Sequence, residues 1–308
     1  ITQEQMASWK QAELHREVKI TFYHLAELME RKSLLLKLDT VYGRFQQSAA
    51  LRLKAGESNL LEKTTADAYL EQLKLQQQQL DGDMTIMQRR LQWLLNTDEM
   101  LLPAYGSFKK EISVLLLNDT SMVQAHPQVQ FSLLNEKTML AQTAVEKTKR
   151  SPDFSFGYNN LSFVGYQSPD GVTQKYYDAG ERFSYFSLSL GIPLFNKATK
   201  SKIKASESNE ELAKMVTAAT VAQLKSSMQQ LAEEFRKQQN GVQFYEQTGL
   251  QQAGLIFKNA RLAFEKGEIS YLEWTLLMNN ATSIQLNYIE AVRQYNQTLI
   301  QLEYLTSK

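Results

Sequence analysis

The 308-residue sequence contains no cysteine, which excludes disulfides, thiolate metal sites and cysteine nucleophiles. It carries 34 basic and 33 acidic residues, so no broad basic surface favours nucleic acid as a partner. No stretch approaches the roughly 18 consecutive apolar residues that a transmembrane helix needs. These absences argue against cysteine-based chemistry, nucleic-acid binding and transmembrane helices before any motif is considered.

Motifs of catalysis are also missing. The sequence contains no phosphate-binding loop, no G-x-S-x-G and no H-E-x-x-H. The three histidines, His15, His24 and His126, are not spaced as paired metal ligands, and the ten methionines are scattered singly. We therefore expect that the protein is not an enzyme and that it binds no metal or other cofactor.

Proline is scarce and confined to the middle third of the chain. Residues 1–102 and 194–308 contain none and are rich in good helix formers. In the first segment, apolar residues recur mostly at steps of three or four, as one stripe of a helix does. This stripe consists of Leu14, Val18, Phe22, Leu25, Met29, Leu35, Tyr42, Phe45, Ala49 and Leu53.

The pattern predicts a helix that ends near Gly56 and a second helix from Leu60 to Leu95, with a weak point at Gly82. The last segment predicts a helix from about Lys197 towards Glu265, weakened at Gly249 and Gly254. Gly267 marks a turn, after which the final helix runs to Leu305. Helices of roughly 50–70 residues would reach roughly 75–105 Å, which is typical of a coiled coil or a tunnel.

The two helical segments resemble each other at an offset of 211 residues. Gly56 and Glu57 then fall on Gly267 and Glu268, and Glu62 falls on Glu273. Several apolar stripe positions also coincide, among them Ala49 with Ala260, Leu61 with Leu272, Leu91 with Leu302 and Leu94 with Leu305. So many matches at one offset indicate an internal repeat.

Between the helical segments, residues 154–195 contain eleven aromatic residues and five glycines. Large apolar residues from Phe186 to Leu194 alternate with small ones, which predicts a strand. A second alternating run begins at Phe154, with a phase slip at Asn159–Asn160 that a bulge could absorb. The polar loop 167–182 carries the turn signal Pro169-Asp170-Gly171. The segment therefore predicts a β-hairpin.

Two interpretations of this hairpin stay open. It could be an amphipathic hairpin packed on a soluble helical core. Alternatively, its large side chains meet lipid and its small ones face a lumen, with aromatic residues at the interfaces. A lone hairpin cannot span a membrane, so this second interpretation requires closure by other hairpins. The membrane-facing residues would be Phe154, Phe156, Tyr158, Phe163, Phe186, Leu188, Leu190, Ile192 and Leu194.

Several local sequences resemble those of the TolC-type outer membrane factors. His126-Pro127 resembles the opening of a repeat in that family, and Ser151-Pro152-Asp153 resembles its entry into a barrel strand. The segment 187–195, SLSLGIPLF, is similar to its exit strand, and 53–57 and 264–268 are similar to its two periplasmic tip turns. The resemblance covers nearly the whole chain and includes the heavy-metal efflux branch of the family.

The resemblance implies a mainly α fold, in which long antiparallel coiled-coil-like helices form a tunnel and one β-hairpin contributes to a trimeric outer-membrane barrel. We expect five parts: a first-repeat helical arm (1–96), an inter-repeat connection (97–125), a second-repeat opening helix (126–150), the β-hairpin (151–195) and a second-repeat helical arm (196–308). The 211-residue offset finds no first hairpin in the sequence. We therefore expect that the natural polypeptide extends upstream or that the chain is a fragment.

The resemblance also implies location and partners. The protein would lie in the bacterial outer membrane with its helical part in the periplasm, as a homotrimer in contact with outer-membrane lipid, a periplasmic adaptor protein and an inner-membrane efflux pump. It would be a passive export duct. The residues implied to contact the adaptor at the tips are Gly56, Glu57, Ser58, Gly267, Glu268 and Ile269.

The acids implied to line the closed entrance are Glu62 and Glu273, each six residues after its tip glycine. Both could instead be solvated residues of a first helical turn, which the helix dipole favours. The alternative for the whole chain is a soluble coiled-coil scaffold or a periplasmic adaptor-like interaction protein. An adaptor usually adds lipoyl-like and barrel β-domains, for which this chain lacks the β content.

Overall fold

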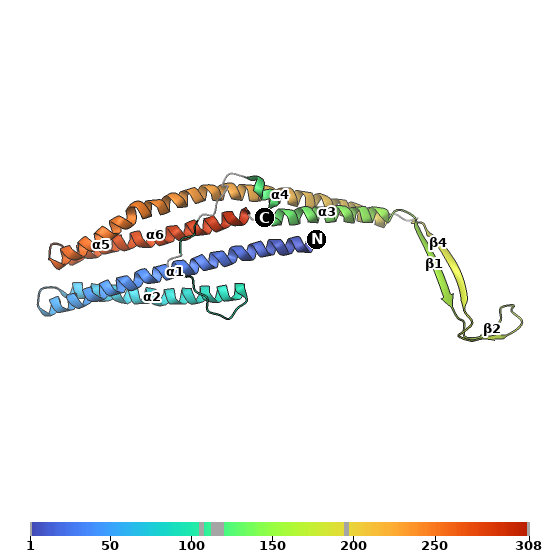
Figure 1. The fold of residues 1–308 in the computed structure, drawn as a ribbon, viewed down its shortest axis with the longest axis horizontal. Coiled ribbons are helices and arrows are strands. Elements are labelled where there is room, and N and C mark those ends of the chain that lie inside the picture. Colours follow the sequence, from blue (N-terminus) through green and yellow to red (C-terminus); the bar gives the residue numbers. More distant parts are fainter. Residues whose placement is uncertain (1, 105–107, 112–119, 194–196, 307–308) are drawn as a thin grey trace. The chain divides into compact units, whose positions relative to one another are not determined.

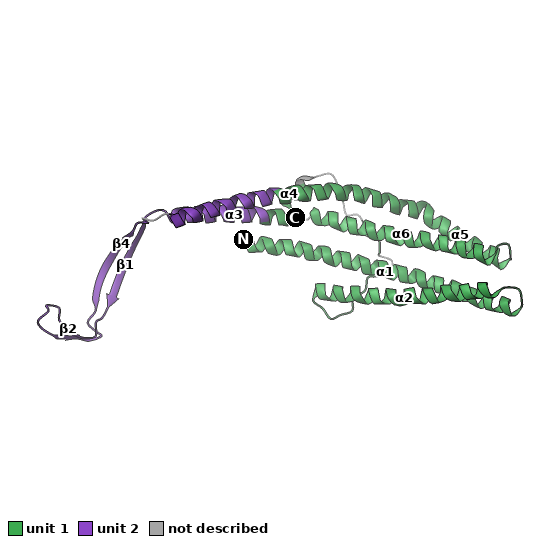
Figure 2. Cartoon of the chain, turned by 180° about the vertical axis from the view of Figure 1, so that it is seen from behind, with its two compact units in different colours: residues 1–131, 219–308 green, residues 132–218 purple. Residues whose placement is uncertain are grey.

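The computed structural model describes residues 2–104, 108–111, 120–193 and 197–306. These residues form two compact units, one of residues 1–131 with 219–308 and one of residues 132–218 (Figure 2). Long helices dominate the first unit, and the second combines parts of two helices with the strands (Figure 1). Each unit is described by itself.

Helices α1 (Thr2–Lys54) and α2 (Leu60–Leu95) form the first helical pair, and α5 (Leu250–Glu265) and α6 (Tyr271–Leu305) form the second. Helix α1 packs along both α2 and α6, so it joins the two pairs. A 3₁₀ helix η1 (Thr120–Ala125) precedes α3 (Pro127–Thr148). Helix α4 (Lys197–Phe244) continues into α5 through a single π-helical segment, η2 (Tyr245–Gly249).

The predicted apolar stripe of α1 forms much of the core. Leu25, Leu35, Tyr42, Phe45 and Ala49 are all buried. Val18, Phe22, Met29 and Leu53 are half-buried, and the first member, Leu14, is 42% exposed. On α6 the buried residues include Leu302 and Leu305, which are apolar positions of the predicted repeat, and Tyr295.

The 211-residue offset is visible in the backbone. Helices α1 and α5 end at positions 54 and 265, and α2 and α6 begin at positions 60 and 271. Gly56 and Gly267 have φ angles of 75° and 74°. The internal repeat predicted from the sequence is therefore confirmed around both turns.

Two of the expected weak points do not interrupt their helices. Gly82 lies within α2 and Gly254 lies within α5, and a Cβ at either position would meet nothing. The expectation is correct only at Gly249, which ends the π-helical segment. A Cβ there would lie 2.9 Å from the ring of Tyr245 and 3.4 Å from Ile284 of α6. The distortion therefore coincides with close packing against α6.

The predicted hairpin is present in the second unit. Strands β1 (Asp153–Leu161) and β4 (Phe183–Gly191) pair antiparallel from Asp153–Gly191 to Leu161–Phe183. Short strands β2 (Gly165–Gln167) and β3 (Lys175–Tyr177) pair beyond them. Gly171, at the predicted turn, has a φ of 73°, and the Asp170 carboxylate accepts the Val172 and Thr173 N–H groups.

The expectation of a bulge at Asn159–Asn160 is wrong. The register is continuous through these residues, with Asn160 opposite Ser184 and Leu161 opposite Phe183. The large side chains change face on both strands at the same level. Because the two strands change together, neither needs an extra residue.

Candidate functional sites

The first tip turn joins α1 to α2 through a left-handed glycine. The Glu57 N–H donates to the Arg52 carbonyl over 2.9 Å, and the Gly56 N–H donates to Leu53 over 3.1 Å. This 6→1 bond and positive φ define a Schellman-type helix end, which favours glycine. Asn59 then caps α2, since its side chain accepts the Glu62 N–H over 2.9 Å.

The second tip turn repeats this geometry. The Glu268 N–H donates to the Ala263 carbonyl over 2.8 Å, and the Gly267 N–H donates to Phe264 over 3.0 Å. Ser270 caps α6 in a full capping box with Glu273. Such a box satisfies two backbone donors at the helix start.

The two predicted entrance acids therefore occupy the same position, the third residue of their helices. The Glu273 carboxylate accepts the Ser270 N–H over 2.8 Å, and hydrogen bonds from the Ser270 backbone and hydroxyl lower the pKa of Glu273. The Glu62 carboxylate accepts the Ser58 hydroxyl over 2.6 Å and lies 3.6 Å from Arg52. Its side chain is only 12% exposed, so it is not simply solvated.

The predicted adaptor-contact residues lie together around the two turns, where most of them are exposed. Gly56, Glu57, Gly267 and Glu268 are exposed, whereas Ser58 and Ile269 are half-buried. Sequence reasoning missed large exposed leucines beside these residues, although Leu61 and Leu272 match in the repeat. Their exposed fractions, in sequence order, are 68%, 74%, 76% and 61% at Leu60, Leu61, Leu272 and Leu276.

An aromatic cluster lies one to four helical turns behind the tips and connects the two helical pairs. The Trp274 ring of α6 stacks on Phe45 of α1 with centroids 4.3 Å apart, and Trp274 is 2% exposed. Asn279 of α6 accepts a hydrogen bond from the Tyr42 hydroxyl over 3.2 Å and donates to the Tyr69 hydroxyl over 3.0 Å. One side chain of α6 thereby contacts both α1 and α2.

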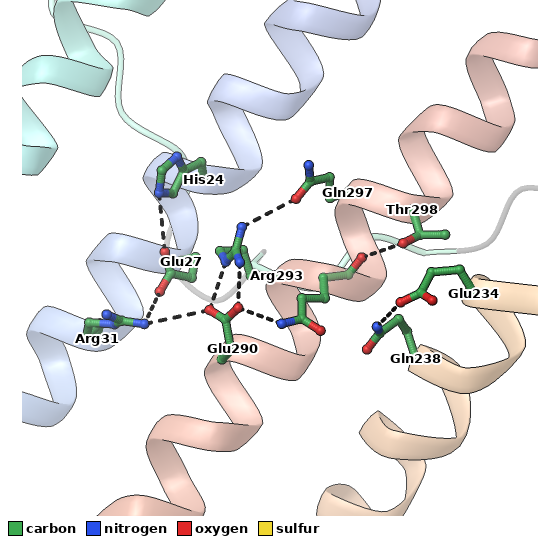
Figure 3. A network of polar contacts seen from close by, with 10 residues as sticks. His24, Glu27, Arg31, Glu234, Gln238, Glu290, Arg293, Gln297 and Thr298 are labelled. Atoms are coloured by element: carbon green, nitrogen blue, oxygen red, sulfur yellow. Dashed lines mark hydrogen bonds and ion pairs between the residues drawn. The ribbon is translucent and has the colours of Figure 1, made fainter. Parts of the chain in front are cut away.

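A charged cluster joins α1 to α6 further from the tips (Figure 3). Glu27 of α1 is 1% exposed, and its carboxylate lies 3.0 Å from the Arg31 guanidinium. Arg31 also lies 3.9 Å from Glu290 of α6, which accepts a hydrogen bond from Arg293 over 2.8 Å. Burial raises the pKa of Glu27, whereas the bond from Arg293 lowers the pKa of Glu290. Sequence periodicity gave no signal for this cluster.

Residues 108–111 are fastened to α6 by a buried amide. The Asn296 side chain, 1% exposed, accepts the Lys110 N–H over 2.8 Å and donates to the Phe108 carbonyl. Glu303 accepts hydrogen bonds from Lys110 and Lys19. Burial raises the pKa of Glu303, but these two hydrogen bonds outweigh it, and the net pKa is lowered.

The hairpin presents one large apolar face. Because side chains alternate along paired strands, Phe154, Phe156 and Tyr158 share a face with their partners Leu190, Leu188 and Phe186. The opposite face over these pairs carries Ser155, Gly157, Ser187 and Ser189.

The large face is exposed within its own unit. The exposed fractions are 72%, 72% and 56% at Phe154, Phe156 and Tyr158, and 70%, 81% and 54% at Phe186, Leu188 and Leu190. Phe163 and Ile192 lie just beyond the strands and are also exposed, while Leu194 lies outside the described residues.

Among the described residues, no helix is both long enough and apolar enough to cross a membrane. The described residues contain no group of three or more His, Asp and Glu side chains placed to hold a metal ion. The first unit therefore contains a pair of matched helix tips. The second unit contains an exposed apolar hairpin.

No protein-family model matches the sequence, and neither does any curated protein. Solved structures do match. A membrane protein from Pseudomonas aeruginosa matches with a TM-score of 0.87 and 15% identity, over 99% of this chain and 70% of that one. CusC, whose crystal structures concern transmembrane channel formation, matches with a TM-score of 0.84 and 13% identity, over 99% of this chain and 71% of that one. The outer membrane protein VceC of Vibrio cholerae matches with a TM-score of 0.81 and 14% identity, over 99% of this chain and 72% of that one.

At these identities the comparisons establish the fold. The chain has the fold of the helical-tunnel outer-membrane channel proteins, as the resemblance found in the sequence implies. The matched structures also include the outer-membrane channels OprN, CmeC of Campylobacter jejuni and MtrE of Neisseria gonorrhoeae.

Proposed function

We propose that the chain is a protomer of an outer-membrane channel that serves as a passive export duct. The match to CusC over 99% of the chain is the observation that carries this proposal. The exposed hairpin supports it, because an apolar face opposite a face of serine and glycine suits a strand pair between lipid and an aqueous lumen.

The barrel requires other copies of the chain. Backbone groups at the hairpin's edges would be unpaired in hydrocarbon, so hairpins from other protomers must close the sheet. A homotrimer in the outer membrane, with its helices in the periplasm, meets this requirement.

The tip turns would contact a periplasmic adaptor, which connects the duct to an inner-membrane pump. Gly56, Glu57, Ser58, Gly267, Glu268 and Ile269 would form this contact, and the exposed leucines beside them would add apolar area. Replacing Leu61 and Leu272 with serine should weaken adaptor binding. Replacing the exposed Leu75, far along α2 from the tip, provides the control.

Glu62 and Glu273 would form rings of like charge at the entrance, which favour cations and resist closure. Glu273→Gln should therefore reduce cation preference or change the resting conductance, and Glu62→Gln should act in the same direction. Glu71→Gln, at an exposed glutamate of α2, is the matched control. Unchanged selectivity and conductance in both tip variants would leave the two acids as helix caps only.

The oligomeric state tests the proposal as a whole. The chain, with any natural sequence that flanks it, is produced in membranes and extracted with detergent. Its molar mass is then measured by light scattering. A channel protomer should require detergent and have the mass of a trimer. A monomer or dimer that is fully soluble without detergent would instead support the scaffold.

A further inference from the structure

Seven basic residues surround the base of the hairpin in the second unit. They lie at the end of α3, just after it and in the first turns of α4, and all seven are exposed. We call this set the basic collar: Lys147, Lys149, Arg150, Lys197, Lys200, Lys202 and Lys204. The corresponding stretches, 146–153 and 197–207, contain only three acidic residues.

Most of the collar has no partner within the described chain. Lys147 pairs with Glu207 over 2.9 Å, and Lys149 pairs with Glu146 over 2.5 Å. The other five residues form no ion pair among the described residues. Lys197, Lys200 and Lys204 are spaced by three and four residues, so they share one face of α4.

The position of the α4 lysines is electrostatically unfavourable for the helix itself. A helix start favours acids, but the first turn of α4 has none and carries Lys197 and Lys200. The α3 members of the collar need no such explanation, because a helix end favours basic residues. The helix dipole therefore does not account for the lysines of α4.

The collar is directly continuous with the exposed apolar face. Asp153 and Gly191 form the first pair of the hairpin, and Phe154 and Leu190 form the next. Arg150 precedes Asp153 by three residues, and Lys197 follows Gly191 by six. Positive charge beside an apolar surface matches the boundary between phospholipid headgroups and hydrocarbon, where long basic side chains reach the phosphates.

We propose that the basic collar binds the phosphate groups of anionic phospholipids at the surface of the membrane that the hairpin enters. This inference rests on the proposed membrane role of the hairpin. The lysines of α4 would fix how deep the hairpin sits, because they hold the start of the helix at headgroup level. Phospholipid is the partner that satisfies both the charge of the collar and the apolar face beside it.

Vesicle binding by the full chain tests the proposal. Binding is measured by sedimentation with vesicles of phosphatidylcholine alone and with vesicles in which phosphatidylglycerol replaces about a third of it. The collar variant is Lys197→Gln, Lys200→Gln, Lys204→Gln. The control variant is Lys37→Gln, Lys54→Gln, Lys258→Gln, which removes the same charge at exposed lysines without an ion pair among the described residues. A hairpin variant, Phe156→Ser with Leu188→Ser, reports the apolar contribution.

The wild type should prefer the anionic vesicles, and the collar variant should bind them on the order of 100-fold more weakly, since each lysine near a charged surface contributes several-fold. The control variant should bind like the wild type. Equal affinity of the collar and control variants, or a wild type without anionic preference, would overturn the proposal. Loss of binding to neutral vesicles in the hairpin variant reports the membrane role separately, so the two hypotheses can fail independently.

Discussion

The two tip turns have nearly the same backbone, but the side chains behind them differ. Both turns use a glycine with φ near 75°, the same 6→1 hydrogen bond and a polar cap. At an offset of 211, however, Lys63 of α2 corresponds to Trp274 of α6. Lys63 pairs with Asp67 near the surface, whereas Trp274 is buried against Phe45. Glycine and cap therefore set the turn, while single side chains decide which helix contributes to the core.

The largest expected effect distinguishes these two positions. Trp274→Ala should lower the free energy of unfolding by about 3–5 kcal/mol, because it removes a buried ring from the cluster that joins the helical pairs. Lys63→Ala should lower it by about 0.5 kcal/mol or less, as for most surface changes. Urea unfolding followed by circular dichroism measures both. Similar losses in the two variants would mean that the cluster does not join the pairs.

The ion pair Lys32–Asp81 between α1 and α2 is exposed, whereas the charged cluster between α1 and α6 contains the buried Glu27. Disrupting this cluster should have the next largest effect. Arg31→Met leaves the buried Glu27 without its closest cation and should cost about 1–3 kcal/mol of unfolding free energy. Adding Glu27→Gln to Arg31→Met should restore most of this loss. No recovery in the double variant would show that Glu27 is not the group that Arg31 stabilises.

The same cluster predicts a pH dependence. Because burial raises the pKa of Glu27, its contribution to stability is full below the ordinary value of 4.5 and is lost as the pH rises through the raised pKa. Glu290 has the opposite sign, because its pKa is lowered. The Glu27→Gln variant should therefore gain stability relative to the wild type as the pH rises from about 4 to 7. A constant difference across that range would contradict the assignment.

The shared backbone of the turns predicts equal costs at equivalent glycines. Gly56→Ala and Gly267→Ala each force an alanine into the left-handed region, which costs roughly 1–2 kcal/mol. The spaces around both glycines are open, so strain in the backbone is the only expected term. Unfolding free energies that differ by more than the error of the measurement would show that the turns are not equivalent.

The caps should give the smallest effects. Ser270→Ala and Asn59→Ala each remove a side chain that accepts a backbone N–H, at a typical cost of about 1 kcal/mol. The loss should be larger at Ser270, because alanine also removes the hydrogen bond that the Ser270 hydroxyl donates to the Glu273 carboxylate over 2.9 Å. A larger loss at Asn59 would reverse this order.

The sequence predicted the long helices, both tip turns and the hairpin, because each has a local signal. Apolar residues at steps of three and four marked α1 and α6, and the two Gly-Glu pairs marked the turns. It did not predict the continuous register of β1 with β4, since the face change at Asn159–Asn160 has to be seen on both strands at once. Nor did it find Glu27 or Trp274, because burial of one charge or one ring depends on a partner helix more than 200 residues away.

The placement of candidate site residues was predictable, but their contacts were not. Glu62 and Glu273 lie where the repeat puts them, yet their hydrogen bonds to Ser58 and Ser270 appear only in the structure. The residues of the basic collar can likewise be read directly from the sequence. Its meaning depends on the hairpin base that brings the end of α3 and the start of α4 together.

Conductance in planar lipid bilayers tests the central claim most directly. The detergent-extracted protein, with any natural sequence that flanks the chain, is added to one side of the bilayer, and single-channel currents are recorded. A channel protomer should produce discrete current steps, and Glu273→Gln should alter their ion selectivity or resting size. A correctly folded preparation that inserts into the bilayer and produces no current steps would contradict the account.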